Sequence, residues 1–249
     1  MQNTSETAIK LGPTYTDEQK KLKIRRCILS LYPHSETLLK AVRDKFDLLI
    51  TYTLPDTWNF NQITDEVYPK IRILLENRIH FYVLPKEWIT AKSGLVEIIA
   101  EILNLRVVDI LQIKDNKNQE IIVGRVCQIL TSDNTLNDIL TLIKQKLNIP
   151  SIQYFGEETN SISQIGIIIG YSPTPQLLKL IKRLKIDTLI STHFNFEIEK
   201  IAEDLDINLI GVSDYITNLG LLKLTQLLRM EHYDIEFAFE NLKPSFKTF

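Results

Sequence analysis

The feature that most constrains the fold of this chain is the alternation of short apolar runs with amphipathic helical patterns. The run Leu48 to Ile50 is apolar without interruption, as a strand covered on both faces is, and Tyr52 and Thr53 follow it directly. In an open α/β sheet, ligands bind at the carboxyl ends of the strands. We therefore expect a candidate site beside Tyr52.

The same alternation continues along the chain. An expected helix, 36–45, capped by Ser35, joins a strand at 26–31 to a strand at 47–51 and so predicts a βαβ unit with parallel strands. Six later helices are expected from caps, prolines and apolar spacing: 69–78, 95–103, 135–147, 175–185, 195–205 and 218–230. Seven later strands are expected from apolar runs or alternation: 79–84, 121–129, 151–155, 165–169, 187–191, 207–212 and 233–240.

These elements predict an α/β protein with two lobes, each a mixed β-sheet flanked by helices, and a cleft between the lobes. We place the first lobe at residues 1–120 and the second at 121–213, with 214–249 packing back on the first lobe. Residues 1–19 are polar and are expected to form a loose arm. Residues 114–120 are expected to form a hairpin loop.

Composition excludes some partners. The net charge of −2 gives no general electrostatic reason to expect nucleic acid or an acidic membrane, and no apolar run is long enough to span a bilayer. One basic cluster, Lys20 to Arg26, is expected to be a solvated edge or strand entry, with an anion or nucleic-acid contact as the alternative. Cys27 and Cys127 lie inside apolar runs, which favours buried, reduced thiols and a cytoplasmic protein without a transit or secretory peptide.

Familiar catalytic motifs are absent from the sequence. It has no dinucleotide-binding or P-loop glycine pattern, and Gly170 to Pro175 is expected to be a plain strand-to-helix connection, with an anion site at the helix start as the alternative. The four histidines are dispersed, and we expect each to be structural or to lie on the surface: His34, His80, His193 and His232. No local elbow supports a nucleophilic triad.

The stretch Phe46 to Thr53 resembles the NGG-one-interacting-factor-three-like family, whose members are also called GTP cyclohydrolase I type 2 homologues. The resemblance then runs nearly end to end, through further stretches at compatible spacing: 29–45, 77–82, 93–97, 124–126, 166–170 and 210–218. The chain is similar to the short form of the family, which lacks an extra domain between the lobes. The resemblance implies a homo-oligomer, often a hexamer.

The resemblance also implies where two divalent metal ions would bind. The family's His-His pair aligns with Tyr52 and Thr53, its aspartate with Ile89, and its His-x-x-x-Glu with Asp214 and Asn218. We expect this site to be degenerate, because a phenol, a hydroxyl, an aliphatic group, one carboxylate and one amide are too few anionic or nitrogen ligands for two cations. A shifted alignment could bring in one further carboxylate, from the loop near residue 87, which would give at most a weak magnesium or calcium site.

We therefore expect a non-catalytic binding or scaffold protein that has no metal or other cofactor and for which no catalytic residue can be assigned. Its partners would be further copies of the chain and a protein, with no membrane and no nucleic acid. The alternative is a metal-dependent hydrolase of a nucleotide or phosphoester, with Tyr52, Thr53 and Asp214 converging in one cleft. Another interpretation of Asp214 and Asn218 is that they cap and flank the last helix.

Overall fold

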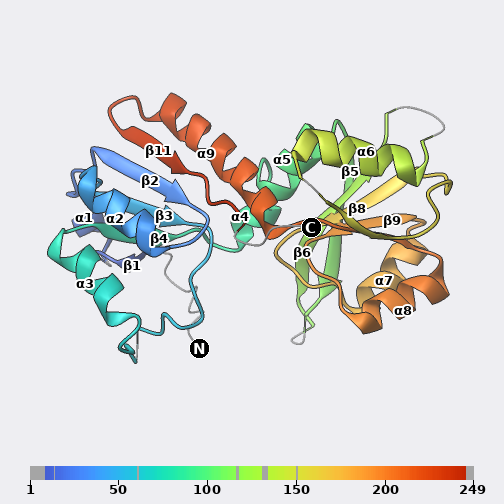
Figure 1. The fold of residues 1–249 in the computed structure, drawn as a ribbon, viewed down its shortest axis with the longest axis horizontal. Coiled ribbons are helices and arrows are strands. Elements are labelled where there is room, and N and C mark those ends of the chain that lie inside the picture. Colours follow the sequence, from blue (N-terminus) through green and yellow to red (C-terminus); the bar gives the residue numbers. More distant parts are fainter. Residues whose placement is uncertain are drawn as a thin grey trace. The chain divides into compact units, whose positions relative to one another are not determined.

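The computed structural model describes residues 9–13, 15–60, 62–115, 118–130, 134–149 and 151–244, and Figure 1 shows its elements. Its contacts divide these residues into two compact units. Unit 1 contains the described residues up to Pro85 together with Leu221–Pro244, and unit 2 contains Lys86–Gly220. This division differs from the boundary expected near residue 120, because α4 and α5 contact β6, and α5 also contacts β5 and β8.

Unit 1 is built on a five-stranded sheet with the order β1-β4-β3-β2-β11. Its strands are β1 (Ile9–Leu11), β2 (Arg26–Ser30), β3 (Leu48–Thr51), β4 (His80–Val83) and β11 (Glu236–Glu240). Four of them are parallel, and β1 is antiparallel to its neighbour β4. The helices assigned wholly to this unit are α1 (Thr16–Gln19), α2 (Ser35–Arg43) and α3 (Tyr68–Glu76).

Both faces of this sheet are covered. Ile28, Leu49 and Phe81 pack with Leu38 of α2 and Leu74 of α3 on one face. On the other face, a smaller cluster forms around three buried residues, Cys27, Leu29 and Phe237, against Leu224 and Leu228 of α9 (Thr217–Glu231). This double covering explains why β2 and β3 are apolar runs rather than alternating ones.

Two expectations for unit 1 were wrong. Ser35 is the first residue of α2, and the helix is capped by His34, whose backbone is extended and whose Nδ1 accepts the Glu36 N–H at 3.4 Å. The expected loose arm also contains order, since Ile9–Leu11 forms β1 and Thr16–Gln19 forms α1. Residues 1–8 of that arm lie outside the described residues.

Unit 2 is built on a six-stranded mixed sheet with the order β5-β6-β8-β9-β10-β7. Its strands are β5 (Arg106–Lys114), β6 (Glu120–Gln128), β7 (Gln153–Phe155), β8 (Gln164–Ile168), β9 (Thr188–Ser191) and β10 (Asn208–Gly211). The strands β8, β9 and β10 are parallel to one another. Strand β5 is antiparallel to β6, β6 is antiparallel to β8, and β7 is antiparallel to β10. Residues 116 and 117 of the expected hairpin loop lie outside the described residues.

Helices lie on both faces of the unit 2 sheet (Figure 1). They are α4 (Glu87–Thr90), α5 (Leu95–Ile102), α6 (Leu136–Leu147), α7 (Pro175–Arg183) and α8 (Phe196–Leu205), followed by the 3-10 turn η1 (Asp214–Ile216). Leu178 and Ile181 of α7, with Ile198 and Ala202 of α8, pack against strand residues such as Leu189. Among the described residues, no helix is both long and apolar enough to cross a membrane.

Candidate functional site

The carboxyl ends of the parallel strands in unit 1 carry a set of hydroxyl groups. The strands β2, β3 and β4 are in register, so Ser30, Thr51 and Val83 lie beside one another. The chain then stays paired beyond β3, because the Tyr52 N–H donates to the Ser30 carbonyl at 3.1 Å and the Thr53 N–H donates to the Leu31 carbonyl at 3.3 Å. The fold therefore places Tyr52 and Thr53 at the edge where the sequence predicted a site.

The hydroxyl groups at this edge engage the backbone. Thr51 Oγ1 donates to the Thr53 carbonyl at 3.0 Å, and Ser30 Oγ donates to the Tyr32 carbonyl at 3.2 Å. Burial, followed by the charge of Asp56, raises the pKa of Tyr32. Ser30 and Thr51 are fully buried, so their hydroxyl groups hold the chain that follows β2 and β3 in place rather than face a ligand.

Unit 2 contains the other three aligned positions. Ile89 lies on α4 and is 4% exposed, so an aliphatic side chain packed in the core occupies the position that the sequence resemblance led us to expect for the family's aspartate. Glu87, on the same short helix, is exposed, and its charge contributes to raising the pKa of Tyr171, although burial contributes more. Tyr171 lies in the Gly170–Pro175 connection after β8, so this carboxylate approaches the carboxyl end of the unit 2 sheet.

The ends of β9 and β10 bring together two residues that are far apart in sequence. His193 Nε2 lies 3.3 Å from Asp214 Oδ2, and His193 Nδ1 lies 3.0 Å from Thr192 Oγ1. Both side chains are open to solvent, at 65% exposed for the imidazole and 53% for the carboxylate. Each ring nitrogen of His193 therefore has one polar neighbour.

Asp214 also occupies the start of a helical segment. It is the first residue of η1, where Ser213 Oγ accepts the Tyr215 N–H at 3.3 Å, and α9 follows directly. Ser213 rather than Asp214 is therefore the cap, so the expectation that Asp214 caps this segment was wrong; its carboxylate lies in the first turn, where it interacts favourably with the helix dipole. Asn218, the second residue of α9, is buried.

Two buried hydroxyl groups lie in the same part of unit 2. Ser191 ends β9 and Thr217 begins α9, and neither side-chain oxygen has a hydrogen-bond partner among the described residues. Within the described ranges, nowhere do three or more His, Cys, Asp or Glu side chains gather as metal ligands would.

Sequence reasoning did not anticipate the His193–Asp214 pair. The two residues are far apart along the chain, so local spacing gives no signal. A usable signal was nevertheless present, because each residue follows the end of one of two neighbouring parallel strands, at Ser191 and Gly211. The aligned positions separate by unit, with Tyr52 and Thr53 in unit 1 and the other three in unit 2.

The comparisons with known proteins indicate one and the same family. Residues 16–245 match the model of the family described as Duf34/NIF3 (NGG1p interacting factor 3). A GTP cyclohydrolase 1 type 2 homolog from Clostridium perfringens is 24% identical over 94% of this chain and 89% of its own. A protein of the same name from Methanocaldococcus jannaschii is 25% identical over 88% of this chain and 84% of its own. The crystal structure of a Bacillus cereus protein related to NIF3 superposes with a TM-score of 0.79 at 11% identity, covering 98% of this chain and 93% of the other.

Proposed function

The chain belongs to the Duf34/NIF3 family, and from this premise we propose that it is a non-catalytic binding or scaffold protein whose dinuclear metal site has degenerated. The burial of Ile89 carries the proposal. A side chain that packs in the core at the position of an expected metal-binding aspartate contributes no ligand and no negative charge.

The other aligned positions support the same conclusion. Tyr52 and Thr53 would have to supply a phenol and a hydroxyl in place of two imidazoles, and both groups are neutral unless a metal deprotonates them. Asp214 is the one carboxylate of the aligned set, and its Oδ2 already faces His193. Two adjacent divalent cations repel one another, and several anionic ligands are needed to offset this repulsion. One carboxylate is too few, so this set of groups cannot hold both ions.

Titration calorimetry with Zn²⁺ and Mn²⁺ tests this proposal. We expect the wild-type chain to show no stoichiometric binding of either ion. The matched positive control carries the family's ligand types at all five aligned positions: Tyr52→His, Thr53→His, Ile89→Asp, Asp214→His and Asn218→Glu. Tight binding of two ions per chain by the wild type would contradict the proposal.

The second candidate function is a metal-dependent hydrolase acting on a nucleotide or phosphoester. The name of the two relatives, GTP cyclohydrolase 1 type 2 homolog, favours it, as do the acid–base groups of His193 and Asp214. The test is hydrolysis of GTP and of a chromogenic phosphoester with added Mn²⁺. Activity that Asp214→Asn abolishes, and that the exposed control Asp204→Asn retains, would establish the hydrolase and refute the non-catalytic function.

We further propose that the protein assembles as a homo-oligomer, with a hexamer as the expected form, and acts in the cytoplasm. The family resemblance supports the assembly, and the buried free thiols of Cys27 and Cys127 suit a reducing compartment. Light scattering coupled to size-exclusion chromatography should give the mass of six chains. A single-chain mass at micromolar concentration would contradict the expected assembly.

A further inference from the structure

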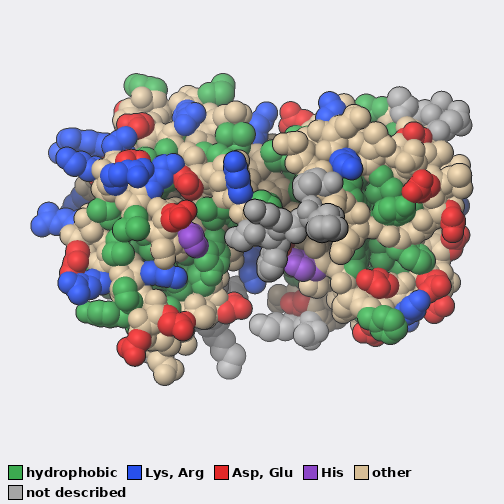
Figure 2. Space-filling model, in the orientation of Figure 1, with side chains coloured by type: hydrophobic (Ala, Val, Ile, Leu, Met, Phe, Trp, Pro, Cys, Tyr) green, Lys and Arg blue, Asp and Glu red, His purple; other side chains and the backbone are tan. Residues whose placement is uncertain are grey.

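The amino-terminal edge of the unit 1 sheet, at the opposite end of the parallel strands from Tyr52 and Thr53, carries a row of cations. We call it the basic edge and define it by six exposed residues: Lys20, Lys21, Lys23, Arg25, Lys45 and Arg78. Figure 2 shows Lys and Arg side chains gathered over the part of unit 1 where Figure 1 places α1 and α2. The net charge of the whole chain is −2, so this concentration of positive charge is local.

Topology explains why these residues meet. Because β1 is antiparallel to β4, the chain leaves β1 at the end of the sheet where the parallel strands begin. It must then pass β4 and β3 to reach β2, which takes α1 and residues 20–25 along that edge. Lys45 and Arg78 precede β3 and β4 at the same edge. Neighbouring strands lie about 4.8 Å apart, so the entries to β2, β3 and β4 span roughly 10 Å.

The segment that leads into β2 presents its cations at regular intervals. Lys21, Lys23 and Arg25 are exposed, whereas Leu22 and Ile24 between them are partly buried. Alternation of this kind is typical of an extended backbone, in which every second side chain is about 6.6 Å further along. That interval is close to the separation of successive phosphates in an extended nucleic-acid strand.

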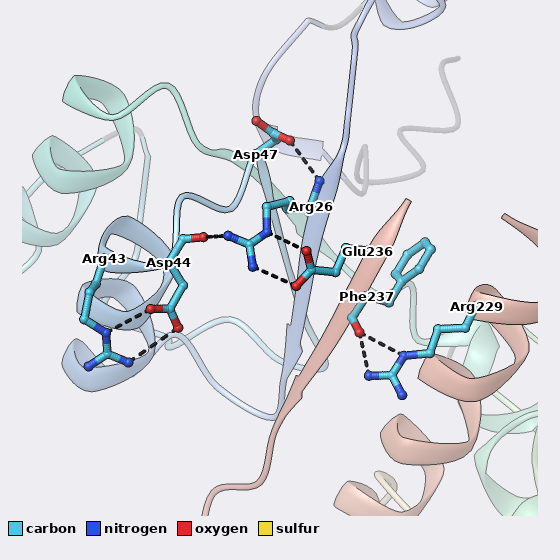
Figure 3. A network of polar contacts seen from close by, with 7 residues as sticks. All are labelled: Arg26, Arg43, Asp44, Asp47, Arg229, Glu236 and Phe237. Atoms are coloured by element: carbon cyan, nitrogen blue, oxygen red, sulfur yellow. Dashed lines mark hydrogen bonds and ion pairs between the residues drawn. The ribbon is translucent and has the colours of Figure 1, made fainter. Parts of the chain in front are cut away.

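Three nearby acidic groups are already engaged (Figure 3), whereas Asp17 and Glu18 of α1 and Asp234 beside Tyr233 are exposed and offset part of the positive charge. Asp47 Oδ2 accepts the backbone N–H groups of Arg25 and Arg26 at 2.8 and 2.9 Å, and Glu236 forms a two-bond pair with the Arg26 guanidinium at 2.9 and 2.7 Å. Asp44 pairs with Arg43 at 2.9 Å. In the described part of the chain, by contrast, none of the six cations of the basic edge forms an ion pair.

An exposed aromatic residue lies at the same edge. Tyr233 is 93% exposed and precedes β11, which is parallel to β2. The first residue of β11, Glu236, donates its N–H to the Arg25 carbonyl at 2.8 Å, which fixes the Tyr233 turn beside the end of the basic segment. Cations that follow a backbone, together with an aromatic face, are the usual components of a surface that binds single-stranded nucleic acid.

We infer that the basic edge binds the phosphate backbone of single-stranded nucleic acid and that a base stacks on Tyr233. A membrane surface fits less well, because Leu22 and Ile24 face the protein and offer no exposed apolar groups for insertion. Within unit 1, the basic edge lies where the parallel strands begin, whereas Tyr52 and Thr53 follow the opposite end of β3.

Two cations of the basic edge also have a structural role at helix ends, and the same arrangement in unit 2 provides a control for the binding experiment. Lys45 and Arg78 follow helices α2 and α3 in left-handed conformation, with φ of 53° and 54°, where a cation also stabilises the helix end. Lys185 follows α7 in unit 2 in the same way, with φ of 57°. Four exposed cations on or just after α7 match, in number and type, the four that the experiment below removes from the basic edge: Lys179, Lys182, Arg183 and Lys185.

The test measures fluorescence anisotropy of labelled oligo(dT) and oligo(U) with the full chain, from low to physiological salt. One variant carries Lys20→Gln, Lys21→Gln, Lys23→Gln and Arg25→Gln, and the control carries Lys179→Gln, Lys182→Gln, Arg183→Gln and Lys185→Gln. We expect a steep salt dependence for the wild type, with a log–log slope of about −3 if about four phosphates are bound. The basic-edge variant should bind at least about tenfold more weakly and with a shallower slope, and the control should bind like the wild type.

Further measurements in the same experiment identify the class of ligand. Tyr233→Ala should weaken oligonucleotide binding about fivefold or more while leaving heparin binding unchanged, because heparin has no bases to stack. Unchanged melting temperatures would show that all variants are folded. The inference is overturned if oligonucleotides do not bind, if both charge variants weaken binding equally, if Tyr233→Ala has no effect, or if phosphatidylserine vesicles bind more tightly than the oligonucleotides.

Discussion

Arg125 illustrates how a single side chain organises part of unit 2. It is 4% exposed, and its guanidinium donates to Glu97 Oε1 at 2.8 Å, to the Thr90 carbonyl at 2.7 Å and to the Gly124 carbonyl at 3.1 Å. Glu97 also accepts the Ser93 N–H at 2.8 Å. One buried cation thus joins β6 to the start of α5 and to the end of α4.

Removing this cation should destabilise the protein strongly. Arg125→Met would leave the Glu97 carboxylate, itself 24% exposed, without its counter-ion and two carbonyls without their donor. We expect the free energy of unfolding to fall by about 2–3 kcal/mol, somewhat less than for a fully buried pair. Urea denaturation measures this change. The control Arg72→Met breaks an exposed pair on α3 and should cost less than about 1 kcal/mol. Equal effects would contradict the importance of burial.

The same pair predicts a pH dependence of stability. Burial raises the pKa of Glu97, but the Ser93 N–H and Arg125 outweigh it, so the folded pKa lies below the ordinary value of 4.5. The stabilisation is therefore complete above the unfolded pKa and is lost as the pH falls through the folded pKa. We expect the stability difference between wild type and Glu97→Gln to shrink as the pH falls from about 5 to about 3. A constant difference in urea midpoint over that range would contradict this assignment.

At the scale of single residues, local patterns predicted that Tyr52 and Thr53 follow a strand end, and the family resemblance implied the aligned positions, but neither predicted which residues they contact. Tyr52 and Thr53 lie at the strand edge where they were expected, because a strand end is a local feature. The contact between His193 and Asp214 depends on which strands are neighbours, and short-range spacing carries no record of that. Likewise, nothing in a sequence window shows that His34 rather than Ser35 adopts the extended conformation that begins α2.

Gly124 limits how closely two strands of unit 2 can approach. A Cβ at this position would lie 2.1 Å from the Ile167 carbonyl oxygen, across the β6–β8 pair. Backbone atoms in a hydrogen-bonded ladder cannot move away without breaking the pairing. We expect Gly124→Ala to lower the free energy of unfolding by about 3 kcal/mol or more, at or beyond the upper end for overpacking.

A second glycine in the same sheet provides the control. A Cβ at Gly166 would lie 3.3 Å from Leu189 Cδ1, the end of a side chain that can rotate. Gly166→Ala should therefore cost no more than about 1 kcal/mol. Chemical denaturation of both variants is sufficient, and a Gly124→Ala protein as stable as the Gly166→Ala protein would contradict the close approach of β6 and β8.

Elements defined by local chemistry were the most predictable. Thr135 and Asp138 form the capping box expected at the start of α6, and Thr174 and Asn195 cap α7 and α8 through their side chains. The strand β1 was missed, because three residues carry no periodic signal and their pairing with β4 is long-range. Strand order and the division into units were likewise beyond local patterns.

At the scale of the whole chain, unit 1 depends on the return of the C-terminal segment. Strand β11 pairs with β2, and Phe237 covers Cys27 and Leu29. Burial raises the pKa of the Cys27 thiol to about 12, and the thiol of Cys127 in unit 2 is raised to a similar value. Neither thiol should react with a thiol reagent in the intact protein at neutral pH, because the thiolate is the reactive form.

Truncation should expose one of these thiols selectively. A chain that ends at Tyr233 lacks β11, so Cys27 loses its cover while Cys127 keeps its own. We expect one reactive thiol per truncated chain and none in a chain ending at Pro244, as measured by the absorbance of a released aryl thiolate. Two reactive thiols, or none, in the shorter chain would contradict the separate cores of the two units.

The family fold is retained across the chain, and we propose that the residues at the aligned metal positions have changed character. Our central claim is that this protein keeps the fold and binds partners without a pair of metal ions. Elemental analysis of the wild-type protein, purified without chelator from metal-supplemented cells, tests this claim most directly. We predict far less than one equivalent of zinc, iron or manganese per chain, and a value near two tightly bound equivalents would contradict the claim.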